Sequence, residues 1–509
     1  MLLSTTIELS APIAFAPDGK LADPAFEAAV APDGSVGAEV AAIGRLAADG
    51  LAAFDLVVEP ALLDQLQRMS DGYERVDGTI VASGSGAAAD AATLLSTLRS
   101  AVTSPSVHVS AMPFAGPNVP ALIASGLGSD LAAQQSTGLQ IVRSILGVEP
   151  DTTLIRPPDG ALDDAAVEAL AGQGATTILG DADTVTRPPQ PLEFAPPPTA
   201  SLAVAGQTVA LVMPDPGAQT LLTSPGFLDD PVRAAQTMLG ELTAIWQEEP
   251  VPSQARGVAI ALPDSAPARF WSAFLERVSE APFLNLTDAQ TLVQRIPPPA
   301  ATSPLTAPST ARFTPGYVGE IKNERRNLLA FRSMLVNPSR VPDRMGRDLL
   351  YAESAAFLGN EDAGRAWIDQ VNAVTGAVFS RAVPDSSQVF TFTAETGSIP
   401  LIMGDPGDLP IRFTVQLRSN RLRFPDGARQ TVTLTRPNQI VTFRATAKAA
   451  GQGQIQVIVR APSGRPIRQT TLIVRSTAVN HIALAVTVAA ALLLLALWSR
   501  RFFSRRRTT

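Results

Sequence analysis

The 509-residue sequence contains no cysteine and only two histidines. The absence of cysteine excludes disulfide bonds, thiolate metal sites and a cysteine nucleophile. His481 borders a long apolar run and His108 stands at the start of a predicted strand, so neither a histidine-rich zinc site nor a Ser-His-Asp triad can be built. The first predicted strand and its following turn carry no GxGxxG pattern of a dinucleotide site. We therefore expect no metal and no cofactor.

Positive charge is scarce outside one short segment. The net charge is −7, and the last ten residues contain five arginines, so the rest of the chain carries −12. Nucleic-acid binding needs clustered lysine and arginine, and we expect no nucleic-acid partner. Hydrophobic residues make up 46% of the chain, which is enough for packed cores in about three domains.

Short apolar runs alternate with amphipathic helical stretches over residues 1–295. The runs cover residues 5–15, 54–60, 107–114, 152–158, 176–182, 208–215 and 257–264. Each has four to eight strongly apolar positions and ends in Pro, Asp or Gly, which is typical of buried parallel strands. Seven such strand–helix units predict a closed or nearly closed β/α barrel, with an open doubly wound sheet as the alternative.

Polar residues follow several of these runs, where the chemistry of a β/α barrel is placed. The candidate ligand-binding mouth consists of Glu59, Arg156, Asp159, Asp181, Asp215 and Asp264. Asn118 and Asp183 are two further polar residues that follow the apolar runs. Opposed carboxylates at such a mouth are what glycoside hydrolysis requires. Aspartate beside proline or glycine is, however, more often a turn or helix-cap residue. We therefore assign no catalytic residue.

The second half of the chain changes character twice. A proline-rich linker is predicted at residues 296–315, and another proline-rich stretch, 186–200, is predicted to be a surface loop. Residues 316–384 place apolar side chains at helical spacing. Residues 385–477 contain seven short alternating segments, which predict an immunoglobulin-like β-sandwich without its disulfide.

An uncharged apolar run near the C-terminus predicts a transmembrane helix over residues 480–499 and a basic cytoplasmic tail over 500–509. The residues expected to form this anchor are Ile482, Trp498, Arg500, Arg501 and Arg505. Because basic residues favour the cytoplasmic side, the bulk of the chain is expected outside the cytoplasm, with the lipid bilayer as a partner.

An N-terminus outside the cytoplasm requires an export signal. The first fifteen residues have no basic segment, a poor apolar core and Glu8 within it, so they do not form one. We expect that the start of the natural protein lies further upstream. The alternative is a tail-anchored protein with a cytoplasmic body.

The ordered set of segments resembles a known family. Its members are actinobacterial single-pass membrane proteins described only as "glycoprotein" or as a domain of unknown function. Residues 56–74, 111–134, 154–179, 236–250, 257–264 and 396–422, together with the arginine-ended anchor, carry the resemblance. It implies an export signal and a role in bacterial envelope assembly, since such genes typically lie beside that of the lipid II flippase.

The same resemblance implies a barrel similar to those of family 57 glycoside hydrolases and polysaccharide deacetylases. The deacetylases use an Asp-His-His metal site, which this sequence cannot form. The hydrolases carry a glutamate nucleophile at the end of the fourth strand, where this chain has Arg156-Pro157-Pro158-Asp159.

Three functions remain open from the sequence. The first is a membrane-anchored, non-catalytic envelope protein that binds cell-wall glycan or an envelope-assembly membrane protein. The second is a carbohydrate-active hydrolase, for which Glu59 with Asp264, or Asp159 with Asp215, are the carboxylate pairs to test. The third is a structural stalk and scaffold.

Overall fold

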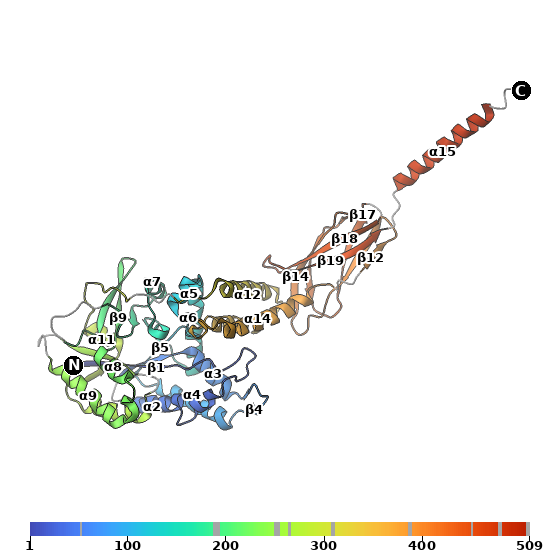
Figure 1. The fold of residues 1–509 in the computed structure, drawn as a ribbon. Coiled ribbons are helices and arrows are strands. Elements are labelled where there is room, and N and C mark those ends of the chain that lie inside the picture. The colour runs from blue at the N-terminus through green and yellow to red at the C-terminus, as the bar shows by residue number, and fades with distance from the viewer. Residues whose placement is uncertain are drawn as a thin grey trace. The chain divides into compact units, whose positions relative to one another are not determined.

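The computed structural model describes residues 1–50, 53–186, 194–248, 255–262, 266–306, 311–384, 389–448, 451–476 and 481–504 (Figure 1). The chain forms two compact units. The first comprises Met1–Ile321 and Arg347–Gln370, and the second comprises Lys322–Gly346 and Val371–Thr509. The division falls inside three helices, whereas the sequence predicts a linker at 296–315 followed by a separate helical segment.

The first unit contains the seven expected parallel strands. They are β1 (Leu2–Leu9), β2 (Phe54–Val58), β5 (Val107–Ala111), β6 (Leu154–Ile155), β7 (Thr177–Leu179), β9 (Gln207–Val212) and β10 (Gly257–Leu262). One sheet has the order β10-β1-β2-β5, with β11 (Asn285–Thr287) also pairing with β1, and the other has the order β6-β7-β9-β8, with β8 at Thr199–Val204.

Two contacts join these sheets into a barrel. A parallel bridge between Ser110 and Asp151 links β5 to the start of β6. On the other side, the backbone N–H of Asp215 donates to the carbonyl of Ala259 at 2.8 Å, which links the end of β9 to β10. The strands therefore follow one another around the barrel in chain order, and the open-sheet alternative is wrong.

Alternation along the strands places one set of side chains outward against helices and the other inward. The covering helices are α1 (Ala25–Val30), α2 (Ser35–Asp49), α3 (Pro60–Ser70), α4 (Gly86–Ala101), α5 (Val119–Ala124), α6 (Leu131–Leu146), α7 (Asp164–Gly172), α8 (Pro216–Thr223), α9 (Pro231–Gln247) and α10 (Ala268–Glu280). A short hairpin, β3 (Tyr73–Glu74) with β4 (Ile80–Val81), lies between α3 and α4 in the chain.

The barrel interior is a packed apolar layer. Five strands supply Val57, Leu154, Leu179, Val212 and Ala259, Met112 directly follows β5, and α11 (Ala289–Arg295) adds Ala289 and Leu292. Because α11 follows β11, which pairs with the start of β1, it closes the end at which the strands begin. The interior is thus filled by side chains and is not a channel.

The predicted surface loop at 186–200 is only partly a loop. Residues 187–193 lie outside the described residues, but Thr199 already begins β8, which pairs antiparallel with β9. Ala205 and Gly206 both have positive φ and form the tight connection between these strands.

Helices are present where the sequence predicts them after residue 315, as α12 (Pro315–Met334), α13 (Val341–Tyr351) and α14 (Glu361–Arg381). Tyr351 anchors the part of this segment that belongs to the first unit. Its ring stacks on Trp367 at 4.5 Å and meets Phe114 edge-on at 4.9 Å, and its hydroxyl donates to Asp64 at 3.0 Å. This segment therefore completes the core of the barrel unit.

The second unit contains a two-sheet β-sandwich. One sheet has the order β12-β19-β18-β14-β16 and the other β13-β17-β15. The strands are β12 (Val389–Phe392), β13 (Thr396–Ile402), β14 (Ile411–Arg418), β15 (Leu422–Arg423), β16 (Arg429–Leu434), β17 (Ile440–Ala447), β18 (Gly451–Arg460) and β19 (Pro466–Ser476). Alternating burial gives the strands an apolar face, as the sequence pattern predicts. The short β15 is the strand that the sequence pattern did not reveal.

The chain continues into α15 (His481–Ser504). The side chains of residues 486–499 are exposed, including Leu492, Leu494 and Trp498. Within the described part of the chain, no helix combines the length and the apolar character needed to cross a membrane.

Candidate functional site

Arg156 is the central charged residue of the barrel mouth. It directly follows β6, the fourth barrel strand, and its side chain is only 11% exposed. Its Nε donates to Glu8 Oε2 at 3.0 Å, and its Nη2 donates to Asp181 Oδ1 at 2.7 Å. Nη1 donates to the carbonyl of Leu179 at 3.3 Å. We call Glu8, Arg156 and Asp181 the mouth triad.

The mouth triad links three strands across the barrel. Glu8 lies in β1 and Asp181 follows β7, while Arg156 follows β6. Burial lowers the pKa of the Arg156 guanidinium, but the Asp181 and Glu8 carboxylates outweigh this and raise the pKa above its ordinary value. The guanidinium is therefore permanently charged, and it compensates two carboxylates that would otherwise repel one another.

Local backbone geometry makes room for this arrangement. Gly160 has a φ of 61°, and a Cβ built there would lie 1.7 Å from Asp181 Oδ2. Asp159, the residue before it, also has a left-handed backbone with a φ of 55°. Aspartate tolerates this conformation better than most residues, and glycine adopts it freely. The sequence Pro158-Asp159-Gly160 therefore forms a tight turn against the Asp181 carboxylate.

A cavity of about 640 Å³ opens at the mouth. Four carboxylate residues line it, namely Glu8, Asp23, Glu59 and Asp159. Its apolar lining includes Ile13, Phe26 and Met112. Glu59 accepts a hydrogen bond from the backbone N–H of Ala11 at 3.3 Å. This volume lies in the range of small-molecule and cofactor sites.

The predicted site residues separate into distinct roles. Glu59 and Asp159 line the cavity, and Arg156 and Asp181 belong to the mouth triad. Asp215 is buried and accepts from the backbone N–H of Ala218 at 2.9 Å, so it caps α8 and does not line the cavity.

The two carboxylate pairs suggested by the sequence have different outcomes. Asp264 lies outside the described residues, so its pairing with Glu59 stays a prediction. Asp159 and Asp215 do not share the cavity. Asn118 caps α5 through Ala121, which is the structural role expected of such a residue.

Sequence reasoning missed Glu8 as a site residue. The sequence identifies Glu8 only as a charge that is incompatible with an export signal. Ser4, Thr6 and Glu8 lie on one face of the strand, and Leu3, Ile7 and Leu9 lie on the other, where Thr5 is the polar exception. That alternation was the available signal for Glu8. It could not identify Arg156, 148 residues further along the chain, as the partner of Glu8.

The opposite end of the barrel holds a second buried polar group. Asp55 in β2 is fully buried and accepts from the backbone N–H of Ala289 at 2.8 Å. Burial raises the pKa of Asp55 to about 8. His108 lies at this end, with Nε2 3.7 Å from Asp288 Oδ2, so it is remote from the mouth as the sequence predicts. Within the described ranges, no group of three or more His, Cys, Asp or Glu side chains could hold a metal ion.

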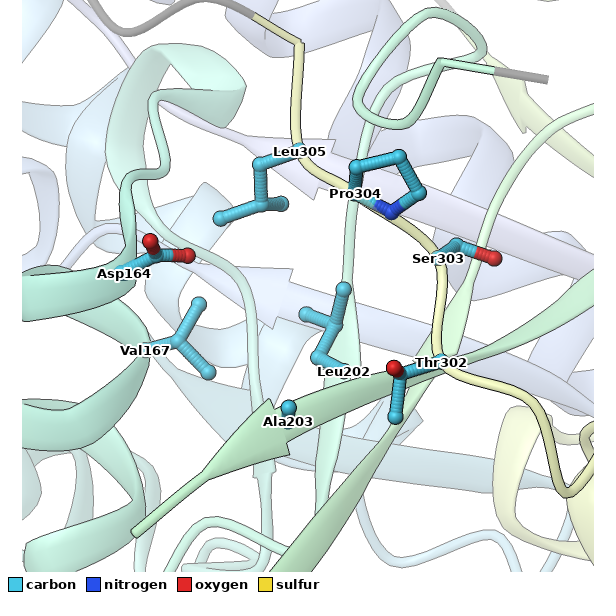
Figure 2. A pocket seen from close by; sticks show the side chains of 8 residues that line it. All are labelled: Asp164, Val167, Leu202, Ala203, Thr302, Ser303, Pro304 and Leu305. Atoms are coloured by element: carbon cyan, nitrogen blue, oxygen red, sulfur yellow. The ribbon is translucent and has the colours of Figure 1, made fainter.

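A smaller cavity of about 230 Å³ lies between α7, β8 and residues 302–305 (Figure 2). Figure 2 shows Asp164 and Val167 of α7 on one side and Thr302 on the other, with Leu202 and Leu305 between them. Ser201 forms a parallel bridge with Thr302, so the extended segment continues the sheet edge. Asp164 is the single carboxylate of this cavity, and its other polar side chains are the hydroxyls of Thr302 and Ser303, so it offers less chemistry than the mouth.

Comparison with known proteins identifies the family. The sequence profile of DUF6049, a family of unknown function, matches residues 45–509. The chain belongs to this family. No functionally curated protein matches the sequence.

Solved structures share the fold of this DUF6049 chain. A GH57-type branching enzyme from Pyrococcus horikoshii aligns with a TM-score of 0.52 and 12% identity, over 74% of this chain and 89% of that chain. A GH57 branching enzyme from Thermococcus kodakaraensis aligns with a TM-score of 0.53 and 11% identity, over 74% of this chain and 90% of that chain. The expected similarity to family 57 barrels is confirmed at the level of the fold.

A putative polysaccharide deacetylase from Mycobacterium smegmatis also aligns, over 60% of this chain and 94% of that chain. Its identity is 13% and its TM-score is 0.38.

Replacing Arg156 with methionine tests the mouth triad. Arg156→Met keeps much of the side-chain volume but leaves Glu8 and Asp181 without their shared counter-charge. We expect the free energy of unfolding to fall by about 3 kcal/mol, the order found when one partner of a buried ion pair is removed. Urea denaturation of the full chain, followed by tryptophan fluorescence, measures this.

The matched control is Arg143→Met, which removes an exposed arginine paired with Glu149. This substitution should leave the unfolding midpoint unchanged, because exposed pairs contribute little. Equal midpoints for both variants and the natural protein would contradict a structural role for the triad.

Proposed function

We propose that this protein is a non-catalytic glycan-binding protein of the bacterial cell envelope, held at the membrane by its C-terminal helix. The proposal has three parts: loss of the hydrolytic nucleophile, retention of a binding cavity, and an apolar anchor. The observation that carries it is the position of Arg156 in the mouth triad.

The first part concerns the fourth strand. The resemblance to family 57 hydrolases places a glutamate nucleophile at the end of that strand, and here the position after β6 is Arg156. A guanidinium is not a nucleophile in glycoside hydrolysis, which needs a carboxylate on each side of the scissile bond. Glu8 and Asp181 are both ion-paired to Arg156, so the guanidinium occupies the two carboxylates beside it. This combination argues against a displaced catalytic pair.

The second part concerns the cavity. Carboxylate oxygens of Glu59 and Asp159 can accept hydrogen bonds from sugar hydroxyls, while Phe26 and Ile13 offer apolar surface to the ring faces. The Thermococcus kodakaraensis enzyme is described in complex with glucose, which supports a sugar as the class of ligand for this fold. A glycan of the cell wall fits the expected location.

The third part concerns the C-terminus. In α15, Val486, Leu493 and Leu495 are each more than half exposed. Such a helix would be costly in water and favourable in lipid. The sequence at 482–498 is uncharged, and the arginines that follow it favour the cytoplasmic side. We therefore propose a single-pass protein whose bulk lies outside the cytoplasm, with the lipid bilayer and cell-wall glycan, or an envelope-assembly membrane protein, as partners.

Glycan binding can be measured directly on the full chain in lipid nanodiscs. Maltoheptaose and tetra-N-acetylchitotetraose serve as neutral probes in isothermal titration calorimetry. We expect at least one to bind, and Glu59→Gln to weaken its affinity about tenfold, because a hydrogen bond to a charged group contributes about 1.5–3 kcal/mol. Asp183→Asn, an exposed aspartate outside the cavity lining, should bind as the natural protein does.

Two results would contradict this function. If neither probe binds, the scaffold interpretation replaces glycan binding. If either probe is cleaved, with new reducing ends whose formation is abolished by Glu59→Gln, the hydrolase alternative is correct.

The anchor is tested by two charged substitutions in α15. Leu493→Arg combined with Leu494→Arg should move the protein from the membrane fraction to the soluble fraction, because each arginine at a helix centre costs about 2.5–3.5 kcal/mol on insertion. Alkaline carbonate washing of membranes followed by immunoblotting measures the partition. The control places arginines at Val389 and Ile440, two exposed apolar positions of the sandwich. Release of the natural protein by the same wash would contradict the anchor.

A further inference from the structure

The β-sandwich carries charge of the opposite sign to the rest of the chain. Residues 389–476 contain twelve lysines and arginines against four aspartates and glutamates, which gives this segment a net charge of +8. Because the whole chain carries −7, all other residues together carry −15. Charge asymmetry of this size between two parts of one chain indicates that the basic part faces an anionic surface.

Five of these basic residues gather at one end of the sandwich. Arg475, at the end of β19, pairs with Gln452 at the start of β18, and Arg418, at the end of β14, pairs with Gln456 four residues further along β18. The short β15 lies at the same end, because it pairs with the last residues of β17. The members of this group, which we call the basic rim, are Arg418, Arg421, Arg423, Lys448 and Arg475.

The rim side chains are exposed, and local contacts keep their segments together. All five are exposed to solvent. The backbone N–H of Lys448 donates to the carbonyl of Arg421 at 2.9 Å, which joins the end of β17 to the start of β15. A Cβ built at Gly453 would lie 2.9 Å from Arg421 Cδ, so this glycine leaves the space over β18 that the stem of Arg421 occupies. The rim is therefore a defined surface formed at strand ends.

Few carboxylates offset the charge of the rim. Among the described residues of the sandwich, Asp405 and Asp408 lie in the loop between β13 and β14, at the opposite end. Asp426 pairs with Arg444 at 3.6 Å, so these two charges compensate one another. Glu395 is the remaining carboxylate, and its backbone carbonyl is hydrogen-bonded to the end of β17. The rim and Glu395 together therefore keep about four positive charges.

The rim lies at the end of the sandwich from which the chain continues into α15. Four residues, 477–480, join Ser476 at the end of β19 to His481 at the start of α15. A fully extended chain covers at most about 3.6 Å per residue, so these two ends are no more than about 18 Å apart. If α15 is held in a bilayer, the rim is therefore confined to the vicinity of the lipid headgroups.

We propose that the basic rim docks on the anionic phospholipid headgroups of the membrane that holds α15. This inference rests on the anchor part of the proposed function, and it depends neither on glycan binding nor on the direction in which α15 crosses. Each cationic side chain near an anionic membrane surface strengthens binding about fivefold, and arginine also binds phosphate through two parallel N–H groups. Continuity with the anchor favours lipid over a soluble anionic partner. Docking orients the sandwich on the bilayer, which a four-residue tether does not do by itself.

The experiment uses the absence of cysteine from the natural chain, which allows one introduced cysteine to be labelled with a fluorophore. Asn420→Cys places the label in the exposed turn between Arg418 and Arg421, at the rim. Ser463→Cys places it in the exposed turn between β18 and β19, at the opposite end. The full chain is inserted into nanodiscs that carry a nitroxide quencher on the lipid headgroups.

We expect the rim label to be quenched in discs that contain phosphatidylglycerol and to be largely unquenched in discs of phosphatidylcholine alone. Raising the salt concentration to about 0.5 M should remove the quenching, because salt screens the attraction between the rim and the headgroups. The label at Ser463→Cys should stay unquenched in both kinds of disc, since it lies at the end away from α15.

Neutralising two rim residues tests which charges act. Arg418→Gln combined with Lys448→Gln should lower the docking equilibrium constant about thirtyfold, because two contributions of about fivefold each are lost. The matched control, Arg412→Gln with Arg436→Gln, removes the same charge from exposed positions at the opposite end and should leave the quenching unchanged.

The outcomes separate this inference from the anchor. If the chain inserts into both kinds of disc but the rim label is quenched equally in both or in neither, docking on anionic lipid is overturned while the anchor stands. Equal loss of quenching in the rim variant and its control would also overturn it. If the natural chain enters neither kind of disc, the anchor itself fails, and the inference fails with it.

Discussion

A guanidinium removed from water costs several kcal/mol unless opposite charge and hydrogen bonds accompany it. Arg156 satisfies this requirement with a carboxylate from β1, a carboxylate that follows β7, and the carbonyl of Leu179. Because these groups come from opposite sides of the barrel, the pairing constrains where the strands end. The tight turn at Gly160 packs directly against the Asp181 carboxylate of this pairing.

The barrel is consequently divided into two layers with different chemistry. Below the mouth triad, Val57, Leu154 and Val212 fill the interior with apolar side chains. Above it, the cavity keeps carboxylates and an apolar wall, which are features of a binding site. The fold is shared with GH57 enzymes, but the fourth strand of this chain ends in a structural cation, and we propose that the cavity above it binds a ligand. Fold likeness at 11–12% identity leaves function to be argued from these residues.

Much of the fold was predictable because buried parallel strands are short apolar runs, and all seven were found from residues 5–264. Two features of the structure could not be predicted from the sequence. Glu8 becomes a site residue only through Arg156, a contact between residues 148 positions apart, and the docking of Tyr351 onto Phe114 is equally non-local. Asp215 is the opposite example, because its role depends on local sequence. An aspartate beside proline is more often a turn or cap residue than a catalytic one, and Asp215 caps α8.

The most direct measurement is a double-mutant cycle between Glu8 and Arg156. Glu8→Gln, Arg156→Met and the double variant are unfolded in urea and followed by tryptophan fluorescence, which reports the first unit through Trp271 and Trp367. The account predicts a coupling energy of about 1.5 kcal/mol or more, as for residues in one buried ion-pair network. Effects that add to within about 0.4 kcal/mol would show that the two residues do not interact, and would contradict the account.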